Sequence, residues 1–194
     1  MAFIVLEGFS GTGKTSLAKM LERDGWVRIT ESAHSLPADI PLADRADTYS
    51  DYALLGQVLT FAPRIKRLRT KSKVVAEGYF LSDLAYFKIR QTLGLSTAFP
   101  AIYTLVSKVM EDSALVPDHY ILLHAESSEI RRRQARKRAR DRNESSYFFE
   151  KYYEFIEEFH RALNQQNYTI VASHPNTRET YLEIRRVLMQ NKLF

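Results

Sequence analysis

The sequence predicts an α/β fold, a three-layer sandwich in which a parallel five-stranded sheet lies between two layers of helices. Short apolar runs alternate along the chain with segments whose apolar residues recur every three or four positions, as strands alternate with helices in such folds. The runs are almost wholly apolar, which is typical of strands buried on both faces of a parallel sheet. A chain of 194 residues with 45% hydrophobic content is long enough for a hydrophobic core, so we expect a single domain over residues 1–194.

Five apolar runs are the predicted strands, and they cover residues 2–6, 26–30, 74–76, 119–123 and 168–172. The periodic segments predict helices after residue 14, over 48–69, 84–93, 100–110, 148–163 and 178–190, and one that begins near residue 128. Pro63 is expected to kink or interrupt the long helix, because proline removes a backbone hydrogen bond from a helix interior.

The first strand leads directly into a glycine-rich run that fits the phosphate-binding pattern G-x-x-x-x-G-K-[ST]. Backbone N–H groups of such a loop turn inward around phosphate oxygens, and the N-terminus of the following helix also favours an anion. Lys14 would reach the β and γ phosphates, and the Thr15 hydroxyl can bind Mg²⁺. The sequence therefore predicts a P-loop NTPase-type fold that binds ATP and Mg²⁺ through Gly8, Gly11, Thr12, Gly13, Lys14, Thr15 and Ser16.

Two acids stand at the carboxyl ends of predicted strands, where ligands of open α/β sheets bind. Glu31 follows the second strand and could accept the proton of an acceptor hydroxyl. Glu77 ends the third strand and could organise Mg²⁺ together with Thr15. We therefore count Lys14, Glu31 and Glu77 as catalytic candidates, with a helix cap or a surface carboxylate as the alternative for each acid.

The formal net charge is +5, and much of the surplus lies in two clusters. One cluster runs from 131 to 142, after the fourth strand, and predicts an arginine-rich helical lid over about 128–146. Arg133 and Arg136 are three residues apart, so they share a helix face and could close on the phosphates. We count both as further catalytic candidates. The other cluster spans 64–73. Either cluster could instead be a solvated helix face or a nucleic-acid contact.

The composition argues against several classes of protein. The sequence has no cysteine, which excludes disulfides and thiolate metal sites. No apolar run approaches the roughly 20 residues of a membrane-spanning helix, and no signal-peptide pattern precedes the first strand. We expect a cytoplasmic protein with no membrane partner.

The order of these motifs resembles the thymidylate kinase and deoxynucleoside kinase group of P-loop kinases. The similarity spans nearly the whole chain, and its phosphate loop is the most specific match. The further matches are the acid after the second strand, the stretch 59–64, Glu77-Gly78-Tyr79 with Ser82 and Ala85-Tyr86, Pro117-Asp118, and an arginine-rich lid containing Asp141-Arg142 and Glu144.

The resemblance implies a role for residues at matching positions. Glu31 is similar to the carboxylate that serves nucleoside kinases as general base, and Arg64 to the arginine that reaches the acceptor's reactive end. Gln57 resembles a base-reading glutamine and Tyr86 an acceptor-pocket aromatic residue, with ordinary helix packing as the alternative. The resemblance also implies a possible homodimer, and its candidate lid arginines are Arg133, Arg136 and Arg138, the last as a nucleotide contact.

Three departures from the family pattern concern the acceptor. Gly78 stands where the family usually has an arginine, and Ser10 where thymidylate kinases typically have an aspartate. Ser32-Ala33-His34 replaces a glycine-rich segment after Glu31. These differences argue against a free monophosphate as the phosphoryl acceptor and favour a hydroxyl group.

We therefore expect an ATP- and Mg-dependent kinase that phosphorylates a nucleoside-like hydroxyl, with a nucleoside monophosphate as the neighbouring possibility. The alternative is a kinase of a nucleic acid, acting at a strand end or on a hydroxyl-bearing modified base in DNA. A third alternative is a nucleotide-binding module without catalysis.

Overall fold

The computed structural model describes residues 1–42, 45–135, 146–164 and 167–194. Its centre is a five-stranded sheet with the order β2-β3-β1-β4-β5, in which all neighbouring strands are parallel. The strands are β1 (Phe3–Gly8), β2 (Val27–Ile29), β3 (Val74–Glu77), β4 (His119–His124) and β5 (Tyr168–Ala172). The predicted parallel α/β sandwich is confirmed.

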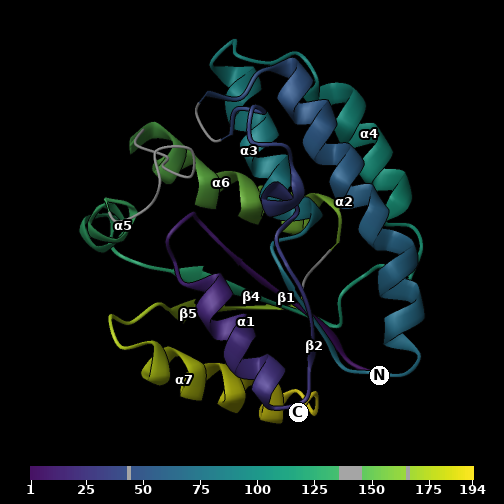
Figure 1. The fold of residues 1–194 in the computed structure, drawn as a ribbon, viewed down its shortest axis with the longest axis vertical. Coiled ribbons are helices and arrows are strands. Elements are labelled where there is room, and N and C mark those ends of the chain that lie inside the picture. Colours follow the sequence, from purple (N-terminus) through teal and green to yellow (C-terminus); the bar gives the residue numbers. More distant parts are fainter. Residues whose placement is uncertain (43–44, 136–145, 165–166) are drawn as a thin grey trace.

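Helices cover both faces of this sheet (Figure 1). One layer contains α1 (Lys14–Arg23) and α7 (Thr177–Gln190). The other contains α2 (Thr48–Arg69), α3 (Phe80–Thr92), α4 (Phe99–Val109) and α6 (Ser146–Ala162). A short 3-10 helix, η1 (Ser32–Ser35), follows β2, and α5 (Ser127–Gln134) follows β4.

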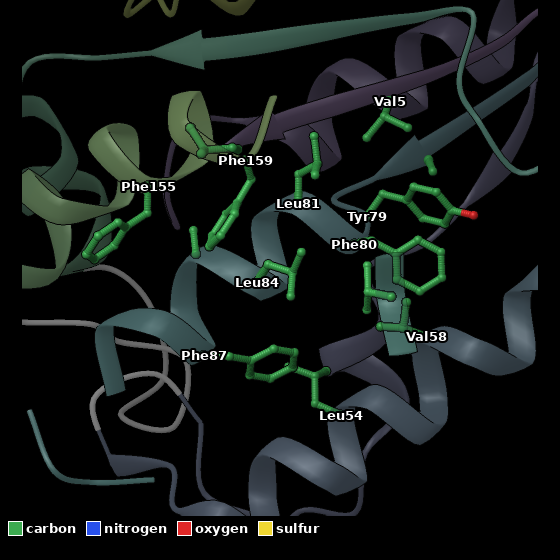
Figure 2. Packing of buried hydrophobic residues seen from close by; sticks show 14 of the residues in the cluster. Val5, Leu54, Val58, Tyr79, Phe80, Leu81, Leu84, Phe87, Phe155 and Phe159 are labelled. Atoms are coloured by element: carbon green, nitrogen blue, oxygen red, sulfur yellow. The ribbon is translucent and has the colours of Figure 1, made fainter. Parts of the chain in front are cut away.

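Two hydrophobic cores hold the layers together. The smaller one packs α1 and α7 on the sheet through residues such as Leu17 and Ile184. The larger one is built around α3, whose Leu81, Leu84 and Phe87 lie among side chains of α2 and α6 (Figure 2). Because α3 is buried on several sides, the residues at its start are fixed relative to the sheet.

Three sequence predictions need correction. Pro63 does not interrupt α2, because it lies on the exposed side of the helix, where solvent can satisfy the carbonyl that proline leaves unbonded. The helix α3 begins at Phe80, so Ser82 and Asp83 lie inside its first turn instead of preceding it. Strand β2 is shorter than expected. Most of the predicted lid, including Arg136 and Arg138, falls outside the described residues.

The carboxyl end of β1 is the place where the site must form. In the register of the sheet, Leu6 pairs with Glu77 and Gly8 with Leu123, so the loop after β1 opens between the ends of β3 and β4. Within the described part of the chain, no helix combines the length and the apolar character needed to cross a bilayer.

Candidate active site

The phosphate loop turns sharply at its first glycine. Gly8 has a φ of +146°, and a Cβ atom built there would be 2.7 Å from Thr12 Oγ1 and 2.8 Å from the Leu123 carbonyl oxygen. Only glycine fits so close an approach. At the other end, Gly13 takes the left-handed conformation as the N-cap of α1. Lys14, which is largely buried, donates to the Gly8 carbonyl oxygen at 2.7 Å and so lies folded over the loop.

Side chains from four distant elements hold the carbonyls and flanks of this loop. From α5, Gln134 donates to the Ser10 carbonyl at 2.9 Å and Arg133 to the Gly11 carbonyl at 3.2 Å. After β5, Ser173 donates to the Thr12 carbonyl at 2.6 Å. The hydroxyls of Tyr152 on α6 and Tyr86 on α3 accept from the N–H groups of Gly8 and Ser10, at 3.1 and 3.3 Å. With its carbonyls bonded outward, the loop can present its remaining N–H groups to an anion.

Thr15 and Glu77 form a pair of oxygen donors beside the loop. The Thr15 hydroxyl donates to Glu77 Oε2 at 2.5 Å. The other oxygen of Glu77 accepts from Arg28 of β2, on the same face of the sheet. Hydroxyl and carboxylate oxygens suit Mg²⁺, which keeps several waters and phosphate oxygens as its other ligands. The pair, together with the glycine-lined cradle, therefore fits an ATP-bound Mg²⁺.

A cavity of about 560 Å³ joins the phosphate loop to Glu31. Gly78 has a φ of +68°, and a Cβ atom built there would be 3.9 Å from Glu31 Cγ and 3.9 Å from Ser82 Oγ. An arginine at position 78 would therefore lie against Glu31. The cavity is lined by Ser10, Gly11, Gly13, Lys14, Thr15, Ser16, Glu31, Ala33, His34, Pro41, Leu42, Ala46, Ser50, Asp51, Leu54, Asp83, Tyr86, Arg90 and Arg133.

An ion pair that the sequence did not predict forms part of the wall of this cavity. Arg90 of α3 donates through Nε to Asp51 Oδ1 of α2 at 2.7 Å, and its Nη2 lies 2.5 Å from the same oxygen. Both side chains are at most 2% exposed. A buried ion pair is costly to desolvate, and this one joins α2 to α3 beside the cavity.

Two further carboxyl groups near the loop are electrostatically unusual. Burial raises the pKa of Glu7, the last residue before Gly8, well above its ordinary 4.5, and the charge of Asp83 adds to the effect. Burial likewise raises the pKa of Asp83 well above its ordinary 3.8, followed by the charge of Glu31. Carboxyl groups of shifted pKa beside a cavity are typical of functional sites.

The structure brings most sequence-predicted residues together. Gly11, Gly13, Lys14, Thr15, Ser16, Glu31, Tyr86 and Arg133 line the cavity, Glu77 bonds to Thr15, and Gly8 and Thr12 form the buried base of the loop. The Arg133 guanidinium contacts Glu129, Gly11, Ser173 and His174. Gln57 and Arg64 lie farther along α2 and are not among the residues that line the cavity, and Arg64 is exposed.

Asp83 and Arg90 were not predicted from the sequence, although they carried one signal. They are spaced i and i+7, with the predicted Tyr86 at i+3, so all three share one face of α3. Nothing local distinguishes such a face from a solvated one.

The basic cluster at 64–73 lies away from the site. Arg69 donates to the carbonyls of Ser113, Ala114 and Val116, and its backbone carbonyl accepts from the Met1 amino group. This position is at the amino ends of the strands, opposite to the phosphate loop. Two more cations there are engaged, Lys66 with Asp112 and Lys73 with the rings of Trp26 and Phe194.

Comparison with solved structures finds similar folds over nearly the whole chain. Thymidylate kinase from Candida albicans has a TM-score of 0.76 at 17% identity, covering 99% of this chain and 92% of that one. Deoxyadenosine kinase from M. mycoides with bound dATP has a TM-score of 0.75 at 14% identity, covering 97% and 100%. Thymidylate kinase from Ehrlichia chaffeensis has a TM-score of 0.64 at 17% identity, covering 97% and 98%. No family model and no curated protein matches the sequence.

Proposed function

We propose that the protein is an ATP- and Mg²⁺-dependent kinase that transfers a γ-phosphoryl group to the hydroxyl of a nucleoside-like acceptor. The observation that carries this proposal is the single cavity in which Glu31 and the phosphate loop face a common space. A donor held at the loop and an acceptor held at Glu31 would meet inside it. The fold shared with thymidylate and deoxyadenosine kinases supports the same reaction class.

The chain's own residues supply the groups that phosphoryl transfer needs. The loop N–H groups and Lys14 would hold the phosphates of ATP in line with the acceptor. Glu31 would accept the proton as the acceptor oxygen bonds to the γ-phosphorus and the bond to the β–γ bridging oxygen breaks, releasing ADP. Thr15 and Glu77 would hold Mg²⁺, which would neutralise charge that develops on the phosphates.

The charges of the cavity favour a hydroxyl over a monophosphate as acceptor. Glu31 and Asp51 line the cavity, and Arg90, which also lines it, already bonds to Asp51. A monophosphate dianion beside Glu31 would be repelled by its negative charge, whereas a neutral hydroxyl acceptor would not.

The Asp51–Arg90 pair favours a phosphoryl acceptor that has a polar edge. The Arg90 guanidinium donates hydrogen bonds and the Asp51 carboxylate accepts them. This combination can bind the hydrogen-bonding edge of a nucleobase. Apolar neighbours such as Leu42 and Leu54 can pack against a planar ring. A nucleoside matches both properties.

An assay of label transfer from γ-labelled ATP tests the proposal, with Mg²⁺ and three acceptor sets: nucleosides, nucleoside monophosphates, and DNA with or without hydroxyl-bearing modified bases. We expect label on nucleosides and none with a Lys14→Ala variant. Label on DNA alone would support the nucleic-acid kinase instead. Absence of label on every acceptor, with ATP binding retained, would overturn the kinase proposal.

A further inference from the structure

Asp83 lies in the first turn of α3 and lines the same cavity as Glu31. Among the described residues, the side chains of Glu31 and Asp83 make no hydrogen bond or ion pair, whereas Asp51 on the same wall is bonded to Arg90. The transfer step described above uses Glu31 as its base and gives no role to Asp83. A second unbonded carboxyl group at the reaction site therefore needs a separate explanation.

Negative groups outnumber positive groups around Asp83. The charged groups that act on Asp83, or on which it acts, come from several parts of the fold. They are Glu7 of β1, Lys14 of α1, Glu31 after β2, Asp51 of α2 and Arg90 of its own helix. Both cations are already engaged, Lys14 with the Gly8 carbonyl and Arg90 with Asp51. Four carboxyl groups that share two engaged cations cannot all be ionised at low cost.

The position of Asp83 along α3 indicates which part of a bound phosphoryl acceptor it would contact. Ser82, its neighbour, borders the Gly78 turn that Glu31 also borders. Arg90 lies seven residues farther, or about 10 Å along a helix. An acceptor with its reacting hydroxyl at Glu31 and its polar edge at Arg90 would therefore pass Asp83 close to the reacting end.

We propose that Asp83 acts as a neutral carboxylic acid that donates a hydrogen bond to an acceptor oxygen next to the reacting hydroxyl. This inference rests on the proposed kinase function for the identity of its partner. It assigns the two unbonded carboxyl groups to opposite roles, Glu31 as the proton acceptor and Asp83 as a hydrogen-bond donor. Pairs of carboxyl groups whose environments differ in this way carry such divided roles in enzymes.

The inference also narrows the substrate class. A donor at Asp83 selects a neutral acceptor that carries an oxygen lone pair near its reacting hydroxyl, as the ring oxygen or second hydroxyl of a pentose does. A phosphate group at that position would add negative charge beside Glu31. As the pH rises through the raised pKa of Asp83, the donor is lost and a negative charge appears, so the affinity for the acceptor should fall.

The first test needs no acceptor. Protein carrying ¹³C at the aspartate carboxyl carbons is titrated by NMR, and the Asp83 resonance is identified by its loss in an Asp83→Asn variant. We expect Asp83 to stay protonated at a pH well above the ordinary aspartate pKa of 3.8. Titration of Asp83 at that ordinary value would overturn the inference, whether or not the protein proves to be a kinase.

The second test uses deoxyribonucleosides as acceptors with Mg²⁺ and ATP. We expect Asp83→Ala to lower kcat/KM for the nucleoside by about tenfold through KM, and Asp83→Asn, which keeps a donor, to recover most of that loss. The wild type should lose affinity at high pH, and the asparagine variant should not. The matched control, Asp39→Asn, should behave as the wild type. Equal losses in the alanine and asparagine variants would show that a carboxylate is required and would contradict the proposal.

Discussion

The Thr15 hydroxyl donates a hydrogen bond of 2.5 Å to Glu77 and so joins the first turn of α1 to the end of β3. Arg28 holds the other oxygen of the same carboxylate from β2. The orientation of Glu77 is thus fixed from two sides before any ligand binds. In the proposed kinase these two oxygen donors are the protein's contribution to Mg²⁺ binding.

Replacement of Glu77 should weaken the effect of Mg²⁺ on ATP binding. In a Glu77→Gln variant the neutral amide keeps the shape but loses the charge, and we expect the Mg²⁺-dependent gain in ATP affinity to shrink about tenfold. Isothermal titration calorimetry with Mg²⁺ and with EDTA measures this gain. Glu22→Gln is the matched control, because Glu22 also contacts Arg28, at 3.7 Å, but lies outside the site. An equal shrinkage in both variants would argue against a metal role for Glu77.

Removal of Arg28 should destabilise the fold. Glu77 is 1% exposed, so an Arg28→Met variant leaves a buried charge without its partner, at a cost of about 3–5 kcal/mol in the free energy of unfolding. Urea denaturation measures the loss. Adding Glu77→Gln to the same chain removes the stranded charge and should restore at least half of it. If the double variant is no more stable than Arg28→Met, the Arg28–Glu77 ion pair does not stabilise the contact between β2 and β3.

An alanine at Gly8 should abolish the phosphate cradle. The added Cβ would approach the Leu123 carbonyl to 2.8 Å at a φ of +146°, so the loop must move. We expect ATP affinity to fall at least tenfold. Gly56→Ala is the control, because Gly56 lies in α2 with open space around it, and that change should stabilise the protein by about 0.5–1 kcal/mol. Unchanged ATP affinity in Gly8→Ala would contradict the geometry of the loop.

Glu7 should impose a pH dependence on stability. Its pKa is raised in the folded protein, so between its unfolded value of about 4.5 and the higher folded value the unfolded chain releases a proton that the folded chain keeps. The stability of the wild type relative to Glu7→Gln should therefore fall as the pH rises above about 4.5, by at most about 1.4 kcal/mol per pH unit. Denaturation curves of both proteins from pH 4 to 8 measure this difference. A difference that does not change with pH would mean that folding leaves the pKa of Glu7 unaltered.

The parts of the fold that the sequence predicts well depend on local signals. The phosphate loop is encoded in consecutive residues, and the strands and helices in hydrophobic period, so the five strands and α2 lie where expected. Pro63 does not end the helix, because packing along the inner side of α2 outweighs one lost hydrogen bond.

The acceptor half of the site depends on how two helices pack, which no local pattern records. The part of α2 that reaches the cavity is its first two turns, at Ser50, Asp51 and Leu54. Arg64 lies 13 residues beyond Asp51, about 20 Å along the helix, so it falls outside the cavity. The Asp51–Arg90 pair joins α2 to α3, and only the packed structure reveals it.

The most direct test of the account is the rate of a single turnover with a Glu31→Gln variant, measured with γ-labelled ATP and the best acceptor of the wild type. General-base catalysis contributes about 10²–10⁴-fold, so we predict a loss of that size in the transfer rate, with ATP affinity within about twofold of the wild type. Transfer by Glu31→Gln at the rate of the wild type would contradict the account, because the acceptor hydroxyl would then react without the carboxylate that shares its cavity with the phosphate loop.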